Sequence, residues 1–200
     1  MVVSLDLEFT AAVRNFRKDS RDALASRYSV PSTAGFRVPG ATLGVARIET
    51  NGSLYQPSET GQGAIIMVTA IVAGGGLEDL LAFRPSAPDE WWFRKGAARW
   101  LGEWELGRRM VTAPVNIEPP ALMSPCRADD PLHVFSTTLD WLRNACDGCV
   151  PLTRGAYADL VNIQAPLTFE DVGHHKKAQQ LMCRPVDLPE SFVRVQELAA

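Results

Sequence analysis

The chain has 200 residues, of which 46% are hydrophobic and 22% are charged, a composition typical of a globular protein that can build a substantial core. Its formal charge of −3 gives no overall attraction to nucleic acid or to an anionic membrane, so either partner would need a local basic patch. We expect one domain over residues 1–200, with the proline-rich connector 111–131 as the place where it could be subdivided.

The sequence predicts a cytoplasmic protein without a membrane partner. Its first residues lack the basic segment and apolar run of a signal peptide. The longest apolar run, residues 64–73, is about half the length of a membrane span. In the cytoplasm, four cysteines favour thiols over disulfides.

The first half is expected to form a helix and then antiparallel hairpins. Apolar residues at helical spacing predict a helix from Ser4 to about Arg27, with a charged outer face that suits solvent better than nucleic acid. Strands are predicted at 43–49 and 54–56 around the hairpin signal Asn51-Gly52. Residues 64–72 are apolar on both faces and predict an interior strand. The pattern further predicts strands at 77–83, where a short helix is the alternative, and at 91–93, and a helix at 97–109.

The second half predicts a short β-α-β unit followed by helices. Its strands would be residues 132–135 and 149–152, and Thr137 with Asp140 would cap a helix that ends near Cys146. Later elements are a helix at 156–162, a helix from a Thr168/Asp171 capping box to about Met182, and an edge strand at 192–195. The fold class is therefore α+β, a mixed sheet with antiparallel hairpins in the first half, the β-α-β unit in the second, and helices packed on the sheet.

The cysteines are the candidate metal ligands. Cys146 and Cys149 form a CxxC pair, and with Cys126 and Cys183 they would make the four ligands of a zinc ion. A second CxxC or CxxH pair, which would strengthen this hypothesis, does not occur. Redox chemistry of a CxxC pair needs a thiolate at a helix N-terminus. Here the pair straddles a predicted helix C-terminus, where the helix dipole disfavours a thiolate. We therefore expect buried structural thiols, no metal and no cofactor.

Acidic residues and histidines supply an alternative, enzymatic hypothesis. In the second half, carboxylates and imidazoles could form an acid/base pair together with the cysteines, although their spacing does not force them together; the residues are Asp129, Asp130, Asp140, His133, His174 and His175. The pairs Glu78-Asp79 and Asp89-Glu90 are expected in loops, and the pair His174-His175 on a solvated helix surface.

The segment 88–109 is the most distinctive part of the chain, because it holds four of the five tryptophans interleaved with basic residues. Trp100 and Trp104 are expected in the core, and one of the adjacent pair Trp91 and Trp92 is expected to be exposed. The leading hypothesis is a non-enzymatic binding or regulatory module. It would engage a protein partner, or a second copy of itself, more readily than nucleic acid. The expected contact residues are Trp91, Trp92, Arg94, Lys95 and Arg99.

Overall fold

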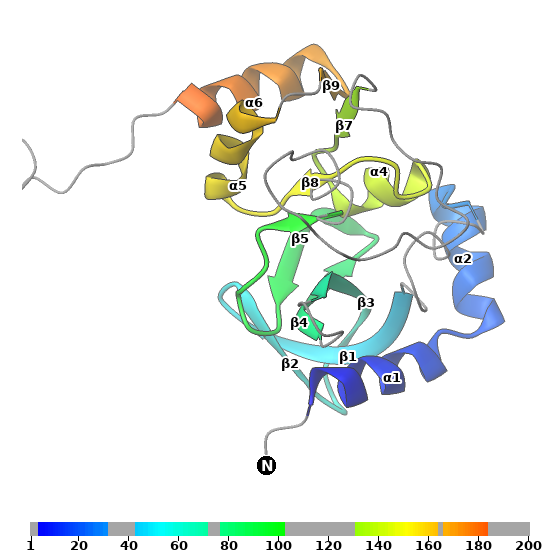
Figure 1. Ribbon diagram of the computed structural model, residues 1–200. Helices are drawn as coiled ribbons and strands as arrows, with labels where there is room; N and C mark the ends of the chain where they lie inside the picture. The colour runs from blue at the N-terminus through cyan, green and yellow to red at the C-terminus, as the bar shows by residue number, and fades with distance from the viewer. Residues whose placement is uncertain (1–3, 32–42, 72–76, 103–130, 164–165, 184–200) are drawn as a thin grey trace, which may run out of the picture.

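The computed structural model describes residues 4–31, 43–71, 77–102, 131–163 and 166–183. Two helices come first, a closed five-stranded barrel follows, and short strands and helices of the second half lie beside the barrel (Figure 1). The predicted α+β class, with antiparallel hairpins in the first half, is confirmed. The segments 103–130 and 184–200 lie outside the described residues, and with them most of the connector 111–131 and the predicted strand 192–195.

The N-terminal segment forms two helices where one was predicted. Helix α1 spans Leu5–Asn15 and helix α2 spans Lys18–Tyr28, with a break at Phe16 and Arg17. The apolar spacing continues across the break, but Ala12 of α1 and Leu24 of α2 belong to different hydrophobic clusters. The chain therefore bends between the helices so that each covers its own part of the core (Figure 1).

The barrel strands follow the order β1-β2-β5-β4-β3, and β3 closes the barrel by pairing with β1. All neighbouring strands are antiparallel except β2 and β5, which meet in parallel at Leu54 and Phe93. The contact between β2 and β5 is this single pair, so the barrel closes there through one residue from each strand. The bounds are β1 Leu43–Asn51, β2 Leu54–Pro57, β3 Gln62–Ile71, β4 Leu77–Arg84 and β5 Ala87–Phe93.

The predicted hairpins and the interior strand are confirmed. Asn51 pairs with Leu54, and Gly52 between them has a φ of 58°, a left-handed conformation that favours glycine. Strand β3 has a partner on each side, and its residues 64–67 are buried. The residue Val72, at the end of the predicted strand, lies outside the described residues. Residues 77–83 form a strand rather than the alternative helix.

Side chains of the barrel alternate between two hydrophobic clusters, one on each face of its wall. Ile66, Leu80 and Ala82 belong to the cluster that α1 covers, and the backbone of β1 approaches α1 at Gly44, where an added Cβ would lie 2.6 Å from Cβ of Ala12. The residues next to them along the strands point to the other face of the wall and belong to the cluster that α2 and the second half cover. They are Ile65, Met67, Leu81 and Phe83. The barrel wall is thus packed on both faces.

The second half consists of short elements joined by two small sheets. Strand β6 pairs antiparallel with β8, and β7 pairs parallel with β9. The predicted β-α-β unit forms in part, because Val134 makes a parallel bridge to Cys149 while β8 itself pairs with β6. The bounds are β6 Trp100–Leu101, β7 Leu132–Val134, α4 Thr138–Arg143, β8 Val150–Pro151, α5 Arg154–Asp159, the 3-10 helix η1 Leu160–Asn162, β9 Leu167–Phe169 and α6 Val172–Cys183.

Several predicted helix boundaries are wrong. Within the segment 97–109, residues 97–99 are irregular and Trp100 begins β6, so no helix starts there; residues 103–109 are not described. Thr137 caps α4 as predicted, but the helix ends at Arg143. Thr168 lies in β9, and α6 is capped instead by Asp171, whose Oδ1 accepts a hydrogen bond from the backbone N–H of His174. No helix in the described ranges is long and apolar enough to cross a membrane.

We expect Ile66→Asp to unfold the domain. Ile66 is 1% exposed and its strand has partners on both sides, so a carboxylate there loses its hydration without gaining a partner, at a cost of several kcal/mol. Thermal unfolding followed by circular dichroism is the measurement, with Gln56→Asp on the exposed side of β2 as control. A folded Ile66→Asp protein with the wild-type melting temperature would contradict the interior position.

Candidate functional site at the Arg84–Trp92 pocket

A buried carboxylate positions the segment that follows β5. Asp79 lies in β4 and is fully buried, which corrects its predicted place in a loop. Its Oδ1 accepts hydrogen bonds of 2.8 Å from the backbone N–H groups of Leu80 and Lys95. Its Oδ2 accepts from those of Ala97 and Ala98, at 2.8 and 3.2 Å. Four donors satisfy the carboxylate and fix the chain after the tryptophan pair.

Arg94 ties the end of β5 to the N-terminal helix. Its Nε donates to Oε2 of Glu8 at 2.8 Å, and the Glu8 side chain is only 9% exposed. Oε1 of Glu8 also accepts from the hydroxyl of Tyr55 at 3.1 Å. Burial raises the pKa of Tyr55, and the neighbouring Glu8 carboxylate raises it further. The phenol is therefore a permanent donor in this contact, and the Arg94 guanidinium is engaged within the protein.

Trp91 and Trp92 face opposite sides of the barrel wall as expected, but both are partly buried, so neither is the exposed residue that the sequence predicted. Trp91 packs against the cluster that includes α2 and the second half, whereas Trp92 packs against the cluster that includes α1. The ring of Trp92 also contacts a charged group, because Cζ of Arg84 lies 5.0 Å from its centroid. This distance is that of a cation–π contact.

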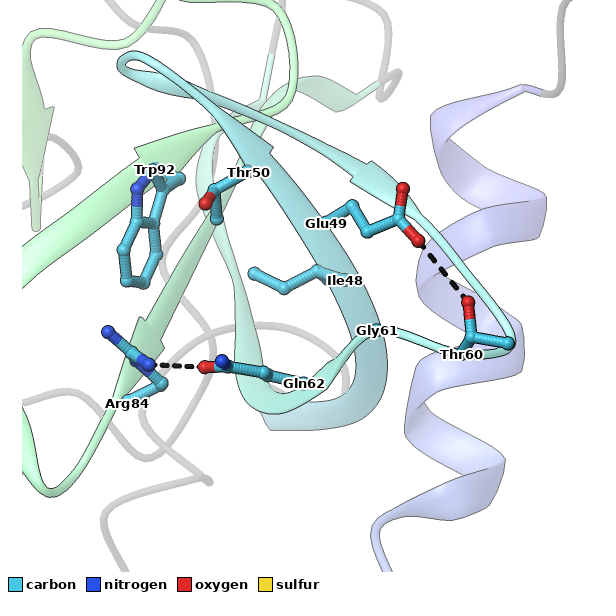
Figure 2. Close-up of a pocket in the computed structure, with 8 residues that line it drawn as sticks. All are labelled: Ile48, Glu49, Thr50, Thr60, Gly61, Gln62, Arg84 and Trp92. Carbon is cyan, nitrogen blue, oxygen red and sulfur yellow. Dashed lines mark hydrogen bonds between the residues drawn. The ribbon is translucent and has the colours of Figure 1, made fainter.

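Trp92 and Arg84 form one side of an open pocket of about 460 Å³ (Figure 2). Strands β1, β3, β4 and β5 and the turn between β2 and β3 supply its walls. At Gly61 in that turn, a Cβ would collide with the backbone carbonyl of Ile48, so the pocket wall depends on a residue without a side chain. The lining residues are Ile48, Glu49, Thr50, Thr60, Gly61, Gln62, Arg84 and Trp92.

Opposite charges lie on opposite sides of this pocket (Figure 2). The Arg84 guanidinium donates from Nη1 to Oε1 of Gln62 and from Nη2 to Oε2 of Glu90 at 2.8 Å. Its Nε is buried and has no hydrogen-bond partner in the described part of the chain. Across the pocket, Oε1 of Glu49 accepts hydrogen bonds from the hydroxyls of Ser58, at 2.6 Å, and Thr60, at 3.3 Å. The pocket therefore combines a stacked cation, an aromatic face and hydroxyl groups.

The predicted contact residues lie in different surroundings. Trp92 lines the pocket, and Trp91 packs on the opposite face of the wall. The Lys95 side chain is exposed, while Nη2 of Arg99 lies 2.5 Å from Oδ2 of Asp159. Trp100 is buried as expected, and Trp104 lies outside the described residues.

The prediction overlooked Arg84. Arg84 precedes Pro85, and this pair was used only to mark the end of the strand predicted at 77–83. The signal that could have found it is the hairpin itself: Ala82 pairs with Trp92, which brings the neighbouring Arg84 within reach of the indole.

The cysteines of the CxxC pair are buried in two different places. Cys146 belongs to the cluster beside α2 and α4, and Cys149 belongs to the cluster beneath α5 and α6. Cys183 is the last residue of α6, and Cys126 lies outside the described residues. Across the described ranges, no group of three or more histidine, cysteine or acidic side chains is arranged to hold a metal ion.

A second pocket, of about 350 Å³, gathers polar residues of the second half, including His133, Asp140 and Glu170. Its two carboxylates already have structural partners. Asp140 accepts from the hydroxyl of Thr137 and from Nη1 of Arg143, and Glu170 accepts from the backbone N–H of Ser136 at 2.6 Å. These contacts hold the ends of α4 and β9 together.

His174 is buried, which corrects its predicted place on a solvated surface; its neighbour His175 is exposed. The imidazole is 3% exposed, stands edge-on to Phe169 with the ring centroids 5.3 Å apart, and places Nδ1 at 3.3 Å from Oε2 of Glu170. Burial lowers the pKa of His174, although the Glu170 and Asp171 carboxylates act in the opposite direction. The prediction failed because α6 turns this position toward the core and the next one toward solvent.

Comparisons of the chain with protein-family models, with curated proteins and with solved structures gave no match.

We expect the buried His174 to make the fold less stable in mild acid. The pKa of His174 is lowered in the folded protein, so below the ordinary histidine pKa of 6.5 the unfolded chain takes up a proton that the folded chain resists. This contribution to the free energy of unfolding is complete near neutral pH and is lost as the pH falls from about 6.5 to the folded pKa. Urea unfolding at pH 7.5 and pH 5.5 measures it.

The matched variants are His174→Phe and His175→Phe. The first should lose less stability than the wild type between the two pH values, and the second, at an exposed position, should follow the wild type. An identical pH dependence in His174→Phe and the wild type would show that protonation of His174 does not oppose folding.

Proposed function

We propose that this protein is a non-enzymatic binding module that engages a protein partner through the pocket formed by Arg84 and Trp92. The observation that carries the proposal is the Arg84 guanidinium stacked on the Trp92 indole at an open pocket of about 460 Å³. Tryptophan and arginine are the residue types most enriched among the contacts that dominate binding energy at protein interfaces. An aromatic face with a few fixed polar groups is also typical of ligand pockets.

The charges around the pocket favour a protein over a nucleic acid. Glu49 lines the pocket and adds a negative charge that a nucleic-acid backbone would meet. A phosphate backbone needs a run of uncompensated cations. Arg94 and Arg99 do not supply it, because Glu8 and Asp159 pair with them.

The enzymatic alternative has less support. In the second pocket Asp140 and Glu170 accept hydrogen bonds that hold backbone and side chains in place. A general base must instead offer its lone pair to a substrate. The proposal also keeps the cytoplasmic location that the sequence predicts.

A peptide-display library panned on the immobilised protein tests the proposal. We expect the enriched peptides to bind the wild type and to lose roughly 2 kcal/mol of binding free energy, about thirtyfold in Kd, with Trp92→Ala in isothermal titration calorimetry. The neighbouring Trp91→Ala is the matched control, because Trp91 packs on the other face of the wall. It should cost stability and leave the Kd of the folded protein unchanged.

Two results would contradict this function. One is a library that yields no saturable binder. The other is a set of enriched peptides whose Kd values are the same for the wild type and for Trp92→Ala.

A further inference from the structure

We infer that the Arg84–Trp92 pocket recognises an acidic side chain of its protein partner, whose carboxylate takes the place of Glu90 on Arg84. This inference rests on the proposed function and adds the chemical class of the ligand group. It follows from three features of the pocket: the weakness of the Arg84–Glu90 pair, the unused donor on Arg84, and the position of Glu49.

The ion pair between Arg84 and Glu90 is weak enough for another carboxylate to displace Glu90. The Arg84 side chain is 31% exposed and that of Glu90 is 55% exposed, and ion pairs this accessible to water contribute little net stability. The strand register also changes here, because Phe83 pairs with Trp91 whereas Arg84 pairs with Ala87. Residues 88–90 therefore have no partner on β4, and Glu90 can leave Arg84 without breaking a strand pair.

Arg84 itself is held in place while one of its donors is unused. Trp92 and Gln62 fix the guanidinium plane, and Glu90 occupies only Nη2. The adjacent Nε is buried and lacks a hydrogen-bond partner within the described residues. A carboxylate that approaches the edge formed by Nε and Nη2 with both oxygens satisfies the two donors together, which is the stronger, bidentate geometry.

Glu49 limits the ligand to one negative charge. Glu49 lines the same pocket as Arg84, and its carboxylate points toward Thr60, where the hydroxyls of Ser58 and Thr60 hold it (Figure 2). A dianionic phosphate would meet this like charge, whereas a single carboxylate can bind at Arg84 with its chain extending along Trp92. The pocket therefore favours a glutamate or aspartate side chain over a phosphorylated one.

The test uses two capped tripeptides, acetyl-Ala-Glu-Ala-amide and acetyl-Ala-Gln-Ala-amide, and inorganic phosphate as a third probe. The indole N–H signal of Trp92 in nitrogen-15 NMR spectra, assigned by its loss in Trp92→Phe, reports binding. We expect a saturable shift with the glutamate peptide that is absent with the glutamine peptide. In Glu90→Gln the Kd for the glutamate peptide should fall about threefold, because the internal competitor, a weak exposed ion pair, is gone.

Matched variants separate the pocket from general charge effects. Arg84→Gln should abolish the response to the glutamate peptide. Arg99→Gln, which removes a cation paired with Asp159 elsewhere, should leave it unchanged. The exposure of Glu90 predicts a melting temperature for Glu90→Gln within a few degrees of the wild type.

Each other outcome overturns the inference. Equal shifts with both peptides would mean that the pocket binds peptides without recognising the glutamate carboxylate. The proposed function would then stand, but the inference of an acidic ligand would be wrong. No shift in either the wild type or Glu90→Gln would exclude carboxylate recognition, and the display library would decide the function separately. Phosphate binding to Glu90→Gln as tightly as the glutamate peptide would remove the selectivity assigned to Glu49.

Discussion

The carboxylate of Asp79 accepts hydrogen bonds from four backbone N–H groups inside the protein, and the chain around β5 depends on this contact. Three of the donors, Lys95, Ala97 and Ala98, lie in the irregular segment between β5 and β6, which has no regular strand or helix partners of its own. Buried backbone N–H groups need hydrogen-bond acceptors. In this segment the Asp79 side chain of β4 supplies the acceptors that a neighbouring strand supplies in a sheet. The same segment positions Arg94, whose guanidinium donates a hydrogen bond to Glu8 on α1, and it leads into Trp100 of β6.

The Arg84–Trp92 pocket is a consequence of how β5 is held at its two ends. At one end Asp79 and the Arg94–Glu8 pair fix the chain just after Phe93. At the other end the register shift beside Arg84 frees residues 88–90 from the strand ladder. A fixed indole therefore lies next to a segment that can change its contacts. This combination of a rigid aromatic wall and an exchangeable carboxylate suits recognition better than a fully paired strand does.

Local patterns predicted most of the barrel, because hairpin signals and apolar alternation report neighbours that are close in sequence. Asn51-Gly52 located the β1–β2 turn, and the apolar run at 64–72 located the interior strand β3. The helix predicted to begin at residue 97 does not start there, because the hydrogen bonds of Ala97 and Ala98 to Asp79 favour an irregular chain that leads into the short strand β6. Within the site, only Trp92 was anticipated. Arg84 and the buried His174 depend on strand register and helix orientation, which bring distant residues together.

Amide hydrogen exchange in Asp79→Asn tests most directly whether this carboxylate organises the chain. Asparagine keeps the size of the side chain but replaces one acceptor oxygen with an amide that cannot accept the two N–H groups of Ala97 and Ala98. We predict exchange at least tenfold faster at these two amides, and a loss of about 3 kcal/mol in the free energy of unfolding. Wild-type exchange rates at both amides, with unchanged stability, would show that the segment is held by other contacts.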